Sequence, residues 1–146
     1  MNGEAMNAEA KTVEATLTDE AFLAALEDGS LPGEAFGHRA HLRLTWLLLR
    51  RHGPEAGTAR VAALLRTFSA AKGAAHKFHA TLTHAWAAQV AAALRACPEG
   101  DFERFLARSP QLREGGWLAQ HYRPETLASP AARAGWVPPD LRALPQ

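Results

Sequence analysis

The sequence predicts an all-α fold, and three observations support this prediction. Alanine is the commonest residue, and apolar residues between the glycines and prolines recur with a period of about 3.6 rather than about 2. No segment shows the alternating β-branched and aromatic pattern of a strand, and the chain contains no isoleucine. The long apolar stripes end near residue 96, beyond which proline and glycine recur. We therefore expect a four-helix core, short C-terminal helices and an extended C-terminal cover.

A chain of 146 residues is long enough for one buried core and too short for two. Residues 1–15 are polar and rich in alanine without a convincing apolar stripe, which is typical of a flexible leader. We expect residues 16–146 to form a single helical domain.

The four core helices have recognisable ends. Thr18 can cap a first helix that ends at Gly29, and Asp19 follows at the positive end of its dipole. Gly53 can end the second and most apolar helix, while Pro54 can open the third without losing a hydrogen bond. We expect these helices at residues 18–29, 38–53, 54–73 and 75–96.

The C-terminal third is divided by Ser109-Pro110, Gly115-Gly116 and Pro124, so its helices are expected to be short. We place them at residues 102–107, 117–121 and 130–134. The proline-rich tail at residues 137–145 cannot form a regular helix and is expected to lie as an ordered, extended cover on the bundle.

Charge and composition exclude several classes of partner. The formal net charge is +1, so no basic field favours nucleic acid and no cationic amphipathic face favours a membrane surface. The longest apolar stretch is far too short to span a bilayer, and no secretory signal is visible, so we expect a cytoplasmic protein. Cys97 is the single cysteine, which excludes an internal disulfide, and it is expected to act as a small hydrophobic residue rather than as a nucleophile.

Three histidines carry the main functional hypothesis. His38 and His41 are three residues apart, which places their imidazoles on one helical face. With His79 from another helix they would supply the three nitrogens typical of a catalytic transition metal that keeps an open position. The pattern predicts one divalent ion, zinc, iron, nickel or copper, bound by His38, His41 and His79.

A structural role for the same histidines stays open. His38 at a helix entrance can satisfy backbone groups, and His41 can be a core residue bonded to Thr45 or to a carbonyl. His76 and His84 are expected at the surface or behind the ligands. The two mid-helix tryptophans most simply belong to the core, although aromatic residues also line small-molecule pockets: Trp46 and Trp86.

Thr83, Tyr122 and Arg133 are candidates for binding a substrate oxygen or transferring a proton. Hydroxyls can donate, and a guanidinium can hold an anionic group. Two of these candidates also have a structural alternative. Thr83 can bond a carbonyl of its own helix, and Arg133 can pair with Asp140 to fix the tail, an ion pair that we favour over a catalytic role.

The order of motifs resembles a group of small bacterial helical proteins. The motifs are Phe-x-His-x-x-His-Leu, aromatic-His-x-Thr-x-Thr, Tyr-x-x-Glu-Thr-Leu-x-Ser-x-x-Ala-Arg and Val-Pro-x-Asp, which together span nearly all of the chain beyond the leader. The resemblance implies that one shared design includes His38, His41, His79, Thr83, Tyr122, Arg133 and Asp140. Those proteins often have Glu directly after the aromatic-His pair, where this chain has Ala80, so a carboxylate ligand or base at that position is missing.

Two classes of function remain. The chain lacks a phosphate-binding loop, a dinucleotide fingerprint, a GxSxG elbow, a CxxC pair and an HExxH helix. The first class is a metal-dependent enzyme with hydrolase, lyase or isomerase chemistry on a small oxygenated or carboxylated molecule, and oxygen activation is possible with iron or copper. The second class is a noncatalytic helical module that binds a small ligand or a protein, with structural histidines.

Overall fold

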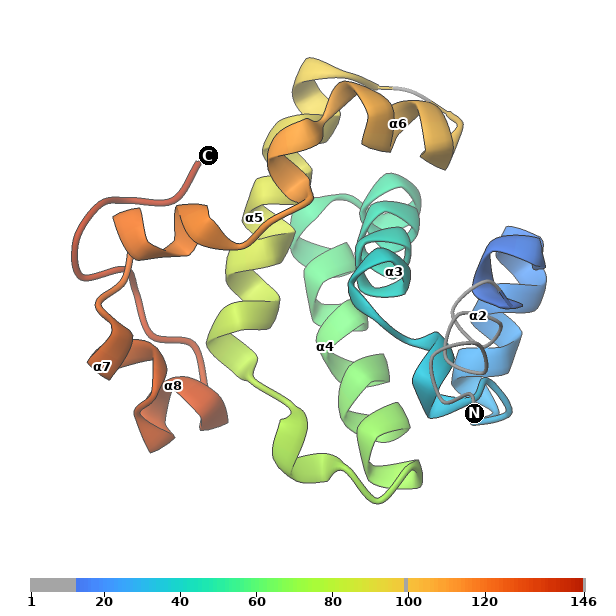
Figure 1. Ribbon diagram of the computed structural model, residues 1–146, viewed down its shortest axis with the longest axis horizontal. Coiled ribbons are helices and arrows are strands. Elements are labelled where there is room, and N and C mark those ends of the chain that lie inside the picture. Colours follow the sequence, from blue (N-terminus) through green and yellow to red (C-terminus); the bar gives the residue numbers. More distant parts are fainter. Residues whose placement is uncertain (1–12, 99, 146) are drawn as a thin grey trace, which may run out of the picture.

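The computed structural model describes residues 13–98 and 100–145, and within these ranges every regular element is a helix or a helical turn. This confirms the predicted all-α class. The long helices before the C-terminal part, labelled in Figure 1, are α2 (Asp19–Glu27), α3 (His38–His52), α4 (Pro54–Ala71) and α5 (Ala80–Ala96). None of the helices in the described ranges is both long and apolar enough to cross a membrane.

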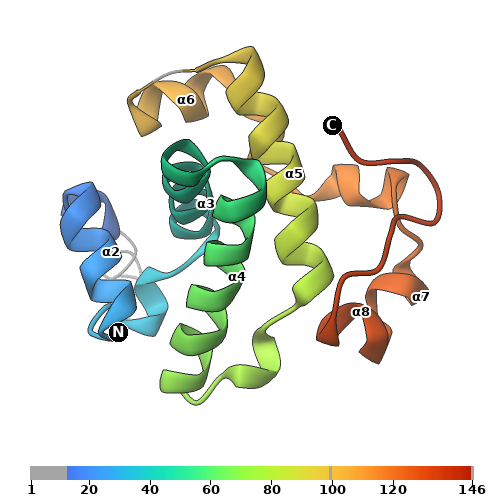
Figure 2. The same cartoon turned by 180° about the vertical axis from the view of Figure 1, so that it is seen from behind.

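Helix α3 is the centre of the core. Every residue from Leu42 to Leu49 is buried, so the helix is covered on all sides. It packs against both α4 and α5, which also pack against each other. Figures 1 and 2 both show α3 between α2 and α5. The helix that is the most apolar in sequence is therefore the central one.

Two glycines set the junction of α3 and α4. Gly53 has a φ of 86°, which glycine adopts without strain, and it ends α3 directly before Pro54 opens α4. One turn later, a Cβ on Gly57 would lie 2.7 Å from Leu49 Cα and 2.8 Å from the Leu48 carbonyl oxygen. The missing side chain of Gly57 thus lets the two helices approach closely, which buries Leu48 and Leu49.

The fourth helix starts later than the sequence predicts. Ala75–Lys77 forms a separate 3-10 turn, Phe78 is extended, and α5 begins at Ala80 with His79 as its N-cap. The His79 side chain accepts a hydrogen bond from the amide of Leu82. An imidazole takes the capping role usual for Ser, Thr, Asp or Asn, so residues 75–79 leave the helix.

The C-terminal part wraps around α5. It contains α6 (Phe102–Arg108), α7 (Pro124–Leu127) and α8 (Pro130–Ala134), with 3-10 turns at Pro110–Leu112 and Gly116–Gln120. The segment expected as a helix at 117–121 is thus the second of these 3-10 turns. Helix α8 packs on α5, and both ribbon views show α7 and α8 on the side of α5 away from α4.

The tail is an ordered, extended cover, as predicted. The amide of Val137 donates to the hydroxyl of Thr81 at 3.0 Å, which joins the tail to α5. Further along, the amide of Leu141 donates to the carbonyl of His121 at 2.9 Å, and His121 Nδ1 donates to the carbonyl of Arg142. These bonds satisfy backbone groups of a segment that has no helical pattern of its own.

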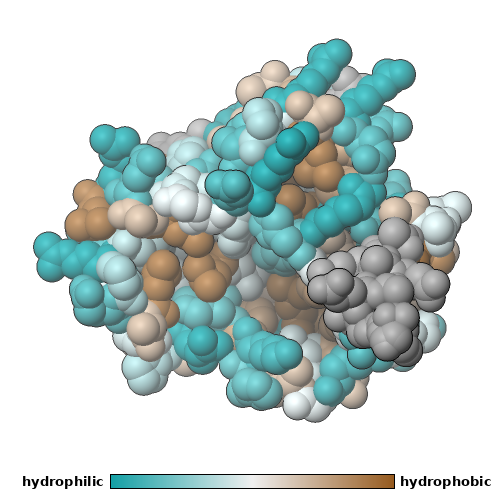
Figure 3. All heavy atoms as spheres, in the orientation of Figure 1, coloured by the Kyte–Doolittle hydropathy of each residue, from teal (hydrophilic) through white to brown (hydrophobic). Residues whose placement is uncertain are grey.

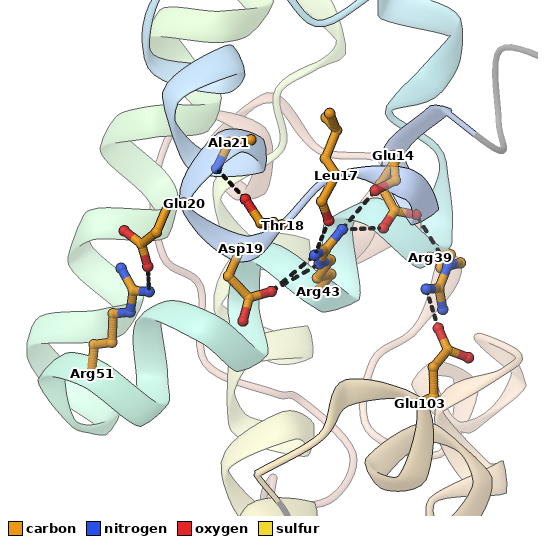
Figure 4. Close-up of polar contacts among 10 residues, drawn as sticks. All are labelled: Glu14, Leu17, Thr18, Asp19, Glu20, Ala21, Arg39, Arg43, Arg51 and Glu103. Atoms are coloured by element: carbon orange, nitrogen blue, oxygen red, sulfur yellow. Dashed lines mark hydrogen bonds and ion pairs between the residues drawn. The ribbon is translucent and has the colours of Figure 1, made fainter.

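The described end of the expected leader belongs to the core. Residues 1–12 lie outside the described residues, but residues 13–16 form a helical turn and Glu14 is 1% exposed. The Glu14 carboxylate forms ion pairs with Arg43 at 2.8 Å and with Arg39 at 3.0 Å (Figure 4). A flexible leader that extends to residue 15 is therefore wrong for Glu14, because two guanidinium groups of α3 hold its charge in place.

Arg43 is the centre of this polar cluster. Its guanidinium also pairs with Asp19 at 2.9 Å and donates to the carbonyl of Leu17 at 2.7 Å. It lies 4.7 Å from the centre of the Phe22 ring. A buried cation needs partners for its donors, and here α2 and the turn before it supply them. The cluster joins α2 to α3.

Candidate functional site

The structure brings the three predicted histidines to two neighbouring helix starts. His38 and His41 lie in the first turn of α3, and His79 caps α5. They do not form a metal-binding group: within residues 13–98 and 100–145, no three His, Cys, Asp or Glu side chains are arranged to hold a metal ion. The three imidazoles differ in their hydrogen bonds, although His41 and His79 line the same cavity.

His79 has no ring nitrogen left for a metal. Its Nδ1 accepts from the amide of Leu82 at 3.0 Å, which requires an unprotonated Nδ1. Its Nε2 lies 2.7 Å from the carbonyl oxygen of Leu127 and therefore donates its proton there. His79 as a residue is 7% exposed. Both nitrogens serve the fold, one at the start of α5 and the other at the end of α7.

His38 is also bonded to a main-chain carbonyl. Its Nε2 donates to the oxygen of Leu112 at 2.8 Å, across the gap between α3 and the turn after α6. The ring contacts the indole of Trp86 edge-on, with centroids 4.8 Å apart. This is the structural role that the sequence left open for His38.

His41 differs from the other two. Burial, and secondarily the positive charge that His38 can carry, lowers the pKa of His41 to about 4. The imidazole is therefore neutral at pH 7, with one N–H donor and one acceptor nitrogen. No hydrogen bond to the ring is found among the described residues; its closest aromatic neighbour is Phe36, with centroids 6.3 Å apart. The expected bond to Thr45 runs from its hydroxyl to the main-chain carbonyl of His41 instead.

His41 faces a cavity of about 600 Å³ between the start of α3, the second half of α4 and the start of α5. A volume of this size is ordinary for a small-molecule pocket. The walls are mainly apolar and aromatic and include Phe36, Leu65, Phe68, Phe78, Leu82 and Trp86. Figure 3 shows hydrophobic side chains recessed among hydrophilic ones on the face viewed in Figure 1. We call this space the α3–α5 cavity.

The three proposed catalytic residues do not meet in this cavity. Thr83 lines it, but its hydroxyl donates to the carbonyl of His79 at 2.8 Å, within its own helix. The Tyr122 hydroxyl donates to the carbonyl of Val137 at 2.7 Å. Burial and the nearby Asp140 charge raise the pKa of Tyr122 to about 12. Tyr122 fastens the tail and does not line the cavity.

Arg133 and Asp140 form no ion pair with each other among the described residues, so that prediction is wrong. The Arg133 guanidinium donates to the carbonyls of His76 at 2.8 Å and Phe78 at 3.3 Å. Asp140 accepts from the hydroxyl of Thr126 at 2.6 Å and from the amide of Arg123 at 3.0 Å. These two bonds, with that from Thr126 the stronger influence, lower the pKa of Asp140. Arg133 is thus held by main-chain carbonyls, and Asp140 by a hydroxyl and a main-chain amide.

Sequence reasoning missed the charged residues of the cavity. Lys72 follows α4 and Lys77 ends the 3-10 turn, and both side chains line the α3–α5 cavity together with Glu34. Lys72 Nζ lies 5.5 Å from the centre of the Phe68 ring. The sequence does show two lysines on either side of Gly73, in the segment between two predicted helices. This pattern does not indicate which cavity the lysines line.

Other sequence expectations agree with the structure. Trp46 and Trp86 are 1% and 8% exposed, as expected for the core. His76 is exposed and His84 half-buried against Trp136. Cys97, partly buried at the end of α5, is a free thiol. It does not line the α3–α5 cavity.

Comparison of the chain with protein families, curated proteins and solved structures gave no match. The resemblance to small bacterial helical proteins therefore stays a prediction. Function has to be inferred from the geometry of the α3–α5 cavity and its histidines.

Proposed function

We propose that this chain is a noncatalytic helical domain that binds a small molecule in the α3–α5 cavity. The observation that carries the proposal is a neutral imidazole, His41, without a hydrogen bond in the described structure and on the wall of an otherwise largely apolar cavity of about 600 Å³. Pockets of this type bind ligands through apolar contact and a few placed polar groups. His41 supplies one donor and one acceptor.

The three-histidine metal enzyme stays a prediction that the geometry favours less. To bind a metal, His79 would have to give up either its bond to Leu127 or its capping bond to Leu82, since a metal takes one ring nitrogen. Without His79, a metal would have two protein ligands, His38 and His41. A structural zinc site has four protein ligands and a catalytic zinc site has three. The cytoplasmic location expected from the sequence also stays a prediction.

The proposal can be tested with N-phenyl-1-naphthylamine, a neutral apolar dye whose fluorescence rises when it leaves water. We expect saturable binding to the full chain. Ser69→Phe places a ring on the cavity wall and should weaken binding about tenfold by occupying the site. Thr67→Phe is the matched control, because Thr67 is exposed on the same helix and does not line the cavity.

Two results would overturn the proposal. One is the absence of dye binding to the folded chain, and the other is equal binding by the two phenylalanine variants. Metal analysis of untagged protein addresses the alternative: one tightly bound transition metal per chain that is lost with His79→Ala would favour the enzyme instead.

A further inference from the structure

We propose that the ligand of the α3–α5 cavity is an apolar molecule with a single carboxylate, held by Lys72 and Lys77 while its body lies against the aromatic wall. This inference rests on the proposed function and specifies its ligand class. It depends on where charge lies around the cavity.

The charges on the cavity wall have a positive excess. Lys72 and Lys77 both line it, against one carboxylate, that of Glu34. Neither lysine forms an ion pair with another described residue, and both are exposed. A third cation is close by, since the Arg66 guanidinium lies 4.8 Å from the centre of the Phe78 ring, which is part of the wall. An anion at this position gains attraction without breaking an existing pair.

The depth of the charges determines where the anionic group lies. The lysine side chains are exposed, so a carboxylate beside them keeps part of its hydration and avoids the cost of full burial. The rest of the wall is largely apolar, as formed by Phe68, Phe78 and Leu82. A ligand with one charged end and an apolar body matches both regions. A lysine side chain behaves in the same way, because its apolar stem can lie on an apolar surface while its ammonium group stays in water.

His41 limits the ligand to a single charge. Because its pKa is lowered to about 4, the imidazole carries no charge at pH 7 and can give one hydrogen bond, but it cannot neutralise a second anionic group. Lys72, Lys77 and Glu34 together leave one excess positive charge on the wall, so a dianion such as a nucleotide phosphate would keep one charge uncompensated. A cationic ligand would meet the two lysines with only Glu34 to balance them.

The test compares decanoate with 1-decanol, which share the same chain length and differ in charge. Each competes with N-phenyl-1-naphthylamine for the full chain at pH 7 and low salt. We expect decanoate to displace the dye at an about tenfold lower concentration than decanol, with the difference shrinking as salt screens the lysines.

Charge variants assign the effect to the cavity. We expect Lys72→Gln and Lys77→Gln each to weaken the binding of decanoate about threefold, which is the size typical of exposed charge pairs. The binding of decanol and of the dye should not change. Arg60→Gln removes one positive charge from an exposed site on α4 that does not line the cavity, and should have no effect. Glu34→Gln should strengthen decanoate binding, because it removes the opposing charge.

The outcomes separate this inference from the proposed function. Two results would show that the ligand does not need a carboxylate and that the cavity is a site for neutral ligands. One is that the dye binds but decanoate and decanol compete with it equally. The other is that the lysine variants behave as Arg60→Gln does. If the dye does not bind, both proposals fail. Stronger competition by decylammonium than by decanoate would also overturn the carboxylate.

Discussion

His79 Nε2 donates a hydrogen bond of 2.7 Å to the main-chain carbonyl of Leu127, a residue 48 positions further along the chain. The other nitrogen of the same ring caps α5 at Leu82. One imidazole therefore joins the start of a core helix to the end of α7. This gives His79 a role in stability that needs no ligand, and it fixes the tautomer with the proton on Nε2.

We expect His79→Ala to lower the free energy of unfolding by about 2 kcal/mol, the sum of a lost cap and a lost, partly buried hydrogen bond to the Leu127 carbonyl. His79→Asn should lose about half as much, because asparagine can still cap α5 but is too short for Leu127. Urea unfolding followed by circular dichroism measures both. Equal stability of His79→Ala and the parent chain would show that neither bond forms in solution.

Arg43 and Arg51 each form an ion pair between α3 and α2, and the two ion pairs differ in burial. Arg43 is 8% exposed and pairs with Asp19 and the buried Glu14, whereas Arg51 pairs with the exposed Glu20 (Figure 4). Arg43→Met should cost about 3 kcal/mol, because it leaves a buried carboxylate with fewer partners. Arg51→Met should cost less than about 1 kcal/mol. Urea midpoints of the two variants make the comparison, and similar losses would contradict it.

Helix ends that depend on nearby residues in the sequence could be predicted. The Thr18 hydroxyl accepts from the amide of Ala21, as its position before Asp19 indicates. Gly53 and Pro54 end α3 and open α4 where expected. Each of these signals depends on one turn of backbone, so no knowledge of tertiary contacts is needed.

Features set by tertiary contacts could not be predicted. Glu14 lies in a segment without an apolar stripe, and the guanidinium groups of Arg39 and Arg43 in α3 account for its burial. The HxxH spacing correctly placed His38 and His41 in one turn of α3, but the bond of His38 to the carbonyl of Leu112 depends on how the C-terminal part packs. Sequence spacing shows which side chains are neighbours on a helix, and not what faces them.

The single tyrosine of the chain allows a direct test of tail packing. Burial raises the pKa of Tyr122 to about 12, and the phenol donates to Val137 in the tail. Ultraviolet absorbance should therefore show phenolate forming near pH 12 in the folded chain and near its ordinary value of about 10 in urea. Because the unfolded chain loses this proton first, stability should fall as pH rises between these values. A folded-state transition near pH 10 would mean that the phenol is not held by the tail.

Acid should destabilise the protein through His41. Its pKa is about 4 in the folded chain and 6.5 in the reference state, so between these values the unfolded chain binds a proton that the folded chain does not. The contribution of neutral His41 to the free energy of unfolding is complete above pH 6.5 and is lost as the pH falls toward 4. The free energy of unfolding then decreases by up to about 3 kcal/mol. His41→Gln, which cannot titrate, should show a shallower decline in the free energy of unfolding between pH 7 and pH 4. His52→Gln, an exposed histidine at the end of the same helix, should keep the parent slope. If His41→Gln and His52→Gln decline in parallel, His41 is not buried in its neutral form, and the polar group assigned to the α3–α5 cavity is not the one that a ligand would meet at pH 7.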